Sequence, residues 1–183
     1  LDKGSPAGDA RAFRRSLGQF ATGVTVITTD VGGTRAGVTA NSFSSLSLDP
    51  PLILWSIART SRSFDLFQQA GHFVVNILSA DQIDVSQRFA SSAEDKFDGI
   101  DWAPGETGSP VLDGVVGYLE CSCEARHQGG DHILLIGRVE QYARFAREPL
   151  LFAQGRYAVA RDHPAMAPMA APSGPGSAPP ETA

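Results

Sequence analysis

The chain has 183 residues, a hydrophobic fraction of 42% and a formal net charge of −5 at neutral pH. This length can support one domain with its own core, and the acidic balance argues against a nucleic-acid binder, which normally carries a basic face. No apolar run approaches the roughly 20 residues that span a bilayer, and the first ten residues lack the apolar segment of a signal peptide. We therefore expect one domain that binds neither nucleic acid nor a membrane.

The two ends of the chain differ in composition from its middle. Residues 164–183 are rich in proline, alanine, glycine and serine and carry almost no charge. Such a segment cannot bury enough apolar surface to offset the entropy lost on ordering. We predict disordered tails at 1–8 and 162–183, and a folded body over 9–161.

The folded body begins with a predicted helix. Asp9 is placed to cap it, and the helix is expected to run to about Ala21. Phe13, Leu17 and Phe20 fall on one stripe at helical spacing, which is the pattern of an amphipathic helix.

Six further segments have the pattern of β-strands. They lie at 24–29, 34–40, 52–57, 72–78, 115–128 and 132–145. The sequences DVGG at 30–33 and GGD at 129–131 are typical of hairpin turns, so the segments that flank each turn are expected to pair as antiparallel strands.

Two short helices are predicted between these strands. One is opened by Ser61 or Ser63 and ends at Gly71, and the other is capped by Asp81. Hairpin-connected strands with few helices favour a mainly β fold, an antiparallel sheet or barrel with helices outside it, over a doubly wound sheet. No GxGxxG sequence follows a strand, which argues against a Rossmann dinucleotide site.

Cys121 and Cys123 are the only cysteines of the chain, and both lie in the predicted strand at 115–128. Alternate residues of a strand point to the same face and are poorly placed for a disulfide, and two cysteines alone make no zinc site. We expect no metal site and two free thiols in a reducing cytoplasm.

The stretch TANSFSSLSLDPP at 39–51 concentrates small neutral hydrogen-bonding side chains. Such residues are common in loops, because they bond to the local backbone. Here, however, the stretch follows a predicted strand, and its double proline favours extended backbone. A rigid uncharged surface suits a flat heteroaromatic ligand with carbonyl and nitrogen edges, each hydrogen bond adding about 1 kcal/mol.

A second polar cluster, SIARTSRS at 56–63, combines two arginines with serines at a predicted helix start. Unpaired helix amides and guanidinium groups are typical of a phosphate site. The alternative is that Ser61 caps the helix and that Arg59 and Arg62 are solvated. A neutral ring site followed closely by a phosphate-type site predicts a nucleotide-like cofactor with an uncharged heteroaromatic end.

Four segments carry a resemblance to a known family. They are FATGVTVIT at 20–28, GVTANSFSSLSLDPPLILWSI at 37–57, SQRFA at 86–90 and GDHILLIGRVE at 130–140. In this order they resemble the flavin reductases that serve two-component flavin-dependent monooxygenases. The resemblance extends from about Phe13 to Tyr157, and it implies a split β-barrel of the FMN-binding type and a homodimer.

The resemblance also implies which residues bind the flavin. The edge of the isoalloxazine ring would be lined by Thr39, Ala40, Asn41 and Ser42, and the ribityl chain or its phosphate would meet Ser45 and Ser47. The phosphate-binding segment would consist of Ala58, Arg59, Ser61, Arg62 and Ser63. Further contacts would come from Arg88 and Phe89, for which a surface ion pair and a core position are the respective alternatives.

In the same resemblance, His132 of the GDH sequence would lie beside the nicotinamide of NADH, with Tyr157 at the border of that pocket. The implied reaction transfers a hydride from NADH to FAD or FMN, and reduced flavin is then released to a partner monooxygenase. The residues do not decide between the two flavins; FAD is favoured, with FMN accepted. NADH is favoured over NADPH, because no additional basic pair is evident for a 2′-phosphate, although Arg59, Arg62 or Arg126 could supply one. Alternatives are a tightly flavin-bound reductase of ferric iron or a corrinoid, and a non-catalytic flavin or haem carrier on the same fold.

Overall fold

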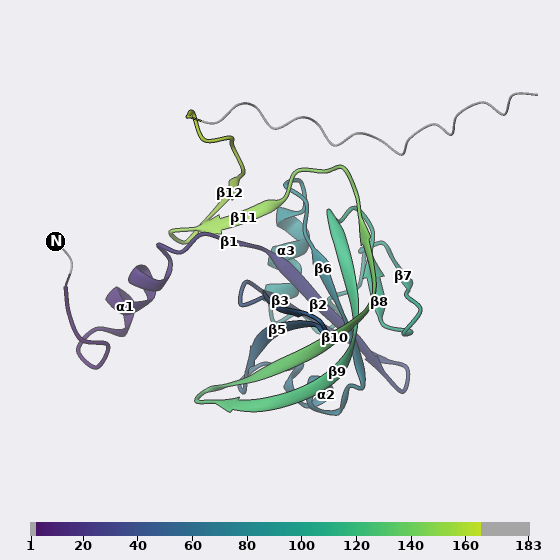
Figure 1. The fold of residues 1–183 in the computed structure, drawn as a ribbon. Coiled ribbons are helices and arrows are strands. Elements are labelled where there is room, and N and C mark those ends of the chain that lie inside the picture. Colours follow the sequence, from purple (N-terminus) through teal and green to yellow (C-terminus); the bar gives the residue numbers. More distant parts are fainter. Residues whose placement is uncertain (1–2, 166–183) are drawn as a thin grey trace, which may run out of the picture.

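The computed structural model of the protein describes residues 3–165, which form three helices and twelve strands (Figure 1). The helices are α1 (Ala10–Leu17), α2 (Phe64–Gln69) and α3 (Ile83–Ala90). The strands are β1 (Thr22–Gly23), β2 (Thr25–Val31), β3 (Thr34–Ala40), β4 (Ser44–Leu48), β5 (Pro51–Ala58), β6 (His72–Ile77), β7 (Trp102–Pro104), β8 (Pro110–Leu112), β9 (Gly117–Gly129), β10 (His132–Arg144), β11 (Leu150–Ala153) and β12 (Arg156–Val159).

Seven strands form the main sheet, in the order β3-β2-β6-β9-β10-β5-β4. All its pairings are antiparallel, and the sheet curls so that β3 at one edge contacts β5 next to the other edge (Figure 1). Two small sheets, β1-β11-β12 and β7-β8, stand beside it. This architecture confirms the prediction of a mainly β, antiparallel fold. Within residues 3–165, none of the helices combines the length and apolar character that crossing a bilayer requires.

Both predicted hairpins are confirmed. β2 pairs with β3 around the turn at 32–33, and β9 pairs with β10 from Gly129 opposite His132 to the far ends of both strands. The second turn needs its glycine, because Gly130 has a φ of 68°, which residues with a side chain rarely adopt. The hairpin therefore brings the GDH sequence to one tip of the main sheet.

Three of the expected boundaries were wrong. Helix α1 begins at the Asp9 cap as predicted but ends at Leu17 instead of about Ala21, and the serine-rich stretch contains strand β4, which was not predicted. Asp81 does not cap α3: Gln82 holds the cap position, and the Asp81 carboxylate accepts a 2.5 Å hydrogen bond from the Ser79 hydroxyl. Short polar side chains can satisfy a nearby turn as well as a helix end, so spacing alone did not separate the two.

The core consists of two apolar clusters, and successive residues of β2 pack in different clusters. Ile27 packs in the first cluster, where the Trp55 indole meets the rings of Phe67 and Phe73 edge to face at centroid distances of 5.0 and 5.8 Å. Val26 packs in the second, beneath α3. Because strand side chains alternate between faces, one strand can join the two clusters into a single domain.

A buried amide connects the small β7-β8 sheet to the main one. The Asn76 side chain is fully buried, and its nitrogen donates to the Val26 carbonyl at 3.1 Å and the Thr28 hydroxyl at 3.0 Å. Its oxygen accepts from the Leu112 amide at 2.8 Å. Because both ends of the amide have partners, it avoids the cost of about 1–3 kcal/mol for an unsatisfied buried polar group.

The ends of the chain were predicted to be tails. Residues 3–8 and 162–165 are exposed, with a turn closed by a hydrogen bond from the Gly8 amide to the Ser5 carbonyl. The remaining parts of the predicted tails, residues 1–2 and 166–183, lie outside the described residues. The boundaries of the folded body therefore stay a prediction.

Candidate functional site

The serine-rich stretch forms a corner between two strands. The β2-β3 ladder stops at Ala40, opposite Thr25, and the β4-β5 ladder resumes at Ser44. The backbone between them, residues 41–43, is therefore outside both ladders, and the Asn41 side chain is exposed. An exposed amide side chain with neighbouring main-chain N–H groups can both donate to and accept from a ligand.

Paired hydrogen bonds hold this corner against β5. The Ser42 hydroxyl accepts from the Ser56 amide at 3.0 Å and donates to the Ser56 carbonyl at 3.2 Å. Since β5 leads directly into the arginine-containing cluster at 58–63, the two polar clusters of the sequence meet in space. The structure thus places the residues predicted to bind the flavin ring next to those predicted to bind its phosphate.

The other side of the corner is anchored by a residue that the sequence analysis missed. The Thr39 hydroxyl donates to the carbonyl of Ser86 at 2.6 Å, and the buried Ser86 hydroxyl lies 2.9 Å from that of Tyr157. Ser86 lies on α3, 47 residues from Thr39 and 71 from Tyr157. No local pattern could reveal this link, which places Tyr157 beside the predicted flavin residues.

The segment predicted to bind phosphate is a tight turn that precedes α2. The Ser61 amide donates to the Ala58 carbonyl, and the Ser63 amide donates to the Ser61 hydroxyl at 3.3 Å. Ser63 holds the cap position of α2 but makes no side-chain cap bond; its hydroxyl donates instead to the Gly37 carbonyl of β3 at 3.4 Å. The turn is therefore tied to β3, and Arg62 remains exposed on its surface.

Arg59 and the GDH sequence lie against each other. The Arg59 amide donates to the Asp131 carbonyl at 2.9 Å and its Nε donates to the Gly130 carbonyl at 3.2 Å, while His132 pairs with Ala58 across the sheet. The Asp131 carboxylate lies 2.7 Å from Nδ1 of His132. This hydrogen bond is the main reason why the pKa of Asp131 lies below its ordinary value.

Strand β4 carries the two remaining serines of the predicted flavin site. Ser45 pairs with Ile53 and Ser47 with Leu52, with a register shift between them that leaves Leu46 without a partner in the ladder. Ser45 is exposed and Ser47 is partly buried, so the two hydroxyls do not share one environment. β4 is an edge strand, so its outer side is open to a ligand or another chain.

Arg88 and Phe89 lie apart from this group. The Arg88 guanidinium donates to the Asp95 and Asp98 carbonyls and forms a 3.3 Å ion pair with the Asp98 carboxylate. Phe89 is fully buried, with its ring edge to face against Phe97 at 5.0 Å. The structure therefore favours the alternatives, a loop-holding arginine and a core aromatic, over direct flavin contacts.

Both cysteines are free thiols. Cys121 is buried in the first core cluster, which raises its pKa to about 12, and burial also raises the pKa of the half-buried Cys123. Thiols that stay protonated at neutral pH are poor nucleophiles. Neither takes part in the candidate site.

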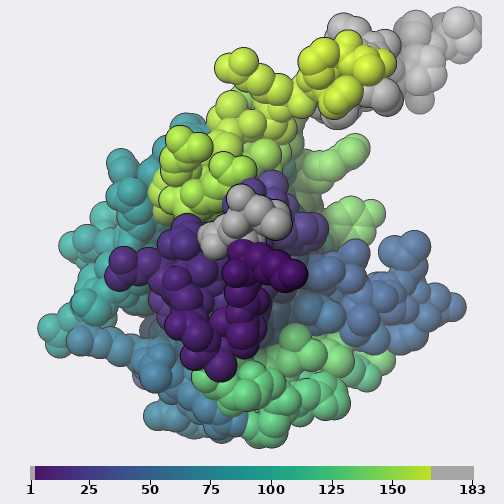
Figure 2. Space-filling model, turned by 90° about the vertical axis from the view of Figure 1, so that its left-hand side faces the viewer, coloured from purple at the N-terminus to yellow at the C-terminus, as the bar shows by residue number. Residues whose placement is uncertain are grey.

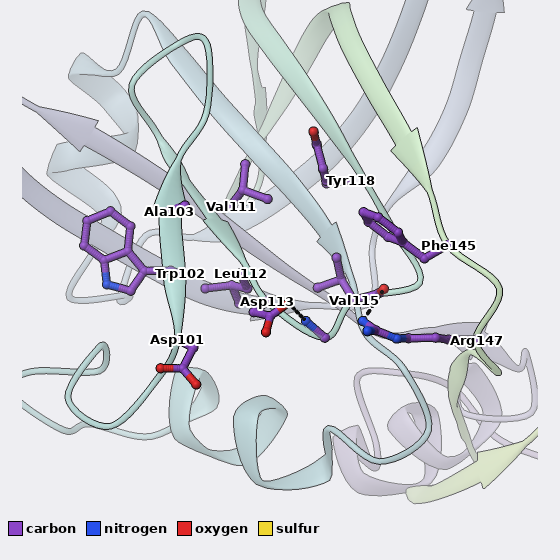
Figure 3. Close-up of a pocket in the computed structure, with 11 residues that line it drawn as sticks. Asp101, Trp102, Ala103, Val111, Leu112, Asp113, Val115, Tyr118, Phe145 and Arg147 are labelled. Carbon is purple, nitrogen blue, oxygen red and sulfur yellow. Dashed lines mark hydrogen bonds between the residues drawn. The ribbon is translucent and has the colours of Figure 1, made fainter.

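A cavity of about 410 Å³ lies elsewhere in the molecule, between the β7-β8 hairpin and the segment that follows β10 (Figure 3). Tyr118, Phe145 and Val115 line it, and Arg147 donates to the Val115 carbonyl at its edge. None of the residues predicted for flavin or NADH lines this cavity. The corner at 39–42 with its neighbours is therefore the candidate site.

Comparison with known proteins gives the family of the chain. The family described as the flavin reductase like domain matches residues 17–161. The chain belongs to this family. It is 45% identical over 152 residues to the flavin-dependent monooxygenase reductase subunit HsaB of Mycobacterium tuberculosis, covering 81% of each chain. It is 42% identical over 153 residues to the FMN reductase (NADH) SmoA of Agrobacterium fabrum, covering 83% of this chain and 87% of that one.

The solved structures agree. The NADH:FAD oxidoreductase SgcE6 of Streptomyces globisporus, in complex with NAD and FAD fragments, superimposes with a TM-score of 0.83 at 37% identity, over 90% of this chain and 99% of that one. This confirms the predicted fold, a mainly β split barrel, and the resemblance found in the sequence. Some other relatives are longer, and the chain spans about half of their length.

Proposed function

We propose that the protein is an NADH-dependent flavin reductase that reduces FAD or FMN and releases the reduced flavin to a partner monooxygenase. The observation that carries this proposal is the corner at 39–42, because it joins main-chain amides that lie outside both ladders, the exposed Asn41 and, through Ser56, the cationic turn around Arg59. Such a donor set fits a flavin, whose ring edge accepts hydrogen bonds and whose phosphate is anionic.

The proposed roles follow from these positions. The amides at 41–43 and the Asn41 side chain would orient the ring edge, where donors stabilise negative charge that develops on reduction. Ser45, Ser47 and the turn at 58–63 would hold the ribityl chain and phosphate. When bound, the flavin accepts a hydride from NADH, so the protein contributes mainly alignment of the two rings.

His132 is the residue we assign to NADH. Its Nδ1 faces the Asp131 carboxylate, which can only accept while it is ionised, so Nδ1 carries the proton. In a neutral ring, Nε2 would then accept from the carboxamide N–H of the nicotinamide. Tyr157 would border the same pocket, since its hydroxyl reaches the Thr39 corner through Ser86.

The openness of the site agrees with release of the flavin. Asn41, Ser45 and Arg59 are all exposed, and Arg59 makes its side-chain hydrogen bond to the hairpin tip. A ligand held at such a surface keeps part of its solvent contact, which limits affinity. We therefore infer that flavin behaves as an exchanging substrate.

The test is steady-state NADH oxidation by purified protein, with and without added FAD or FMN. We expect turnover to depend on added flavin and to saturate with it, and the oxidised flavin band to disappear when the reaction is mixed anaerobically. Protein that retains stoichiometric flavin through gel filtration and ignores added flavin would support the tightly bound alternative. Flavin binding without NADH oxidation would support the carrier.

Two variants sharpen this test. Asn41→Leu should raise the KM for flavin, because the polar contacts at the ring edge are lost. His132→Ala should raise the KM for NADH and slow hydride transfer, whereas His127→Ala, an exposed histidine on β9, should leave both unchanged. Unaltered kinetics of His132→Ala would exclude our nicotinamide assignment.

We also propose that the protein is a homodimer and works in the cytoplasm. Support for the dimer comes from exposed apolar side chains on α1 and β4, including Leu17 at 58% and Leu48 at 94% exposure. Sedimentation velocity should give twice the chain mass, and Leu48→Ser together with Leu17→Ser should shift it toward the monomer. Free Cys121 and Cys123 are the state that a reducing cytoplasm maintains.

A further inference from the structure

A cavity of about 340 Å³ adjoins the phosphate-type turn at 58–63. Two of its lining residues, Arg62 and Ser63, belong to that turn, so the cavity continues the proposed phosphate site. The other walls are the first half of β3, at 34–37, and the loop at 93–97. Its volume falls within the range of about 300–1,000 Å³ of pockets that hold small ligands.

Three cations from separate segments meet at this cavity: Arg35 of β3, Arg62 and Lys96. The Arg35 guanidinium lies 4.7 Å from the centre of the Trp102 ring, a cation–π contact that does not use its N–H donors. Arg62 donates to the Ser92 carbonyl at 2.6 Å and keeps further donors. The arginines are thus held in place with donors left for a ligand.

Lys96 is held in the same way. Its ammonium donates to the Gly37 and Phe89 carbonyls at 3.2 and 2.8 Å, and a third N–H remains. Its pKa is lowered, first by burial and then by the charge of Arg62. Mutual repulsion of two cations is relieved when an anion binds between them, so the cavity is prepared for an anionic occupant.

The acidic residues of the cavity narrow the class of ligand. Glu94 and Asp95 also line it, and carboxylates repel a bare phosphate but accept hydrogen bonds from hydroxyl and amino groups. A ligand that fits must therefore carry an anionic phosphate next to neutral donors. A nucleotide provides both, in its phosphate and in its ribose hydroxyls and adenine amino group.

We propose that this cavity takes the adenylate end of FAD and makes FAD the preferred flavin, with Arg35 and Lys96 contacting the phosphate nearer the adenosine. The inference rests on the proposed function, because it assumes that the phosphate shared with FMN lies at the turn at 58–63. FMN lacks the second phosphate and the adenosine, so it serves as an internal control.

The test is equilibrium binding of oxidised FAD, FMN and NADH, each measured separately by titration calorimetry. Arg35→Gln keeps most of the side chain on Trp102 and removes the charge. It should raise the Kd for FAD about fivefold, the effect of losing one solvent-accessible charged contact, and leave the Kd for FMN unchanged. Arg35→Glu should have a larger effect of the same kind. Arg144→Ala, which removes an exposed charge at the end of β10, is the matched control and should change neither.

A competition experiment on the unaltered protein tests the same inference without relying on variants that could fail to fold. Added 5′-AMP should weaken the apparent affinity for FAD and leave that for FMN unchanged. Equal weakening of FAD and FMN in Arg35→Gln, or no effect of AMP, would overturn the inference. A higher Kd for NADH with FAD unchanged would assign the cavity to the adenylate of NADH instead. Failure of NADH oxidation with both flavins would refute the proposed function, which these binding measurements do not use.

Discussion

Helices α1 and α3 have the same length of eight residues and are both amphipathic, but they differ in how much of their surface is buried. α3 packs on the main sheet and buries Ser86 and Phe89 completely. α1 buries none of its residues, and it stands out from the barrel between the C-terminal strands and the β9-β10 hairpin (Figures 1 and 2). An apolar stripe in a helix sequence therefore predicts which face tends to be buried, but it does not predict which part of the protein, or which partner, packs against that face.

The difference has a functional meaning. α3 contacts two parts of the candidate site. The Ser86 carbonyl of α3 accepts a hydrogen bond from Thr39, and Phe89 packs against Gly37. The Gly37 carbonyl in turn accepts hydrogen bonds from Ser63 and Lys96. α1 keeps Phe13 at 44% and Leu17 at 58% exposure. We therefore expect changes on α3 to act on folding and changes on α1 to act on assembly.

The largest expected effect comes from the same change made on each helix. Phe89→Ala should lower the free energy of unfolding by about 3–5 kcal/mol, because it opens a cavity in the second core cluster. Phe13→Ala should cost less than about 0.5 kcal/mol within one subunit. Chemical denaturation at several protein concentrations measures both: the loss in Phe13→Ala should depend on concentration if α1 lies in a dimer interface, and that in Phe89→Ala should not. Equal, concentration-independent losses would remove the distinction.

An intermediate effect is expected where α3 meets the sheet. A Cβ added at Gly37 would lie 2.3 Å from a ring carbon of Phe89. Gly37→Ala should therefore destabilise the fold by about 1–3 kcal/mol through overpacking, as measured by thermal or chemical unfolding. Gly71→Ala is the control, because its Cβ would meet nothing within 4 Å. Equal free energies of unfolding for the two variants would show that the contact between Phe89 and Gly37 is not tightly packed.

The smallest effect is expected at the start of α1. Asp9 accepts hydrogen bonds from the Arg11 and Ala12 amides at 2.9 Å, and the bond from Ala12 is the main cause of its lowered pKa. A carboxyl with a lowered folded pKa stabilises the helix above the ordinary value of 3.8 and loses this effect as pH falls through the folded value. NMR shifts of α1 should therefore report loss of helix on acidification. Asp9→Asn, which caps without titrating, should remove this pH dependence; persistence of the dependence would exclude Asp9 as its source.

Much of the candidate site could be predicted from the sequence, because it depends on short segments. The corner at 39–42 and the turn at 58–63 are continuous runs whose residue types indicate their chemistry, whereas the role of the tip at 130–132 came from the family resemblance. Their proximity follows from β5, which joins the first two, and from the pairing of β5 with β10, which adds the third. Arg88 and Phe89 were assigned to the flavin by family resemblance, and the fold gives them a loop contact and a core position, which were the alternatives for these two residues.

The amino-acid sequence by itself determined six of the strands, β2, β3, β5, β6, β9 and β10, together with the hairpin turns and the polar composition of the site. These features depend on residues close along the chain: β-branched runs, glycines in turns, and serines beside arginines. Only the tertiary structure decided which apolar faces are covered and which distant residues meet. The Ser86 link between Thr39 and Tyr157 and the cationic cavity of Arg35, Arg62 and Lys96 are of this kind. Such contacts depend on how the sheet curls and where α3 docks, and these are set by the packing of the whole core rather than by any one segment.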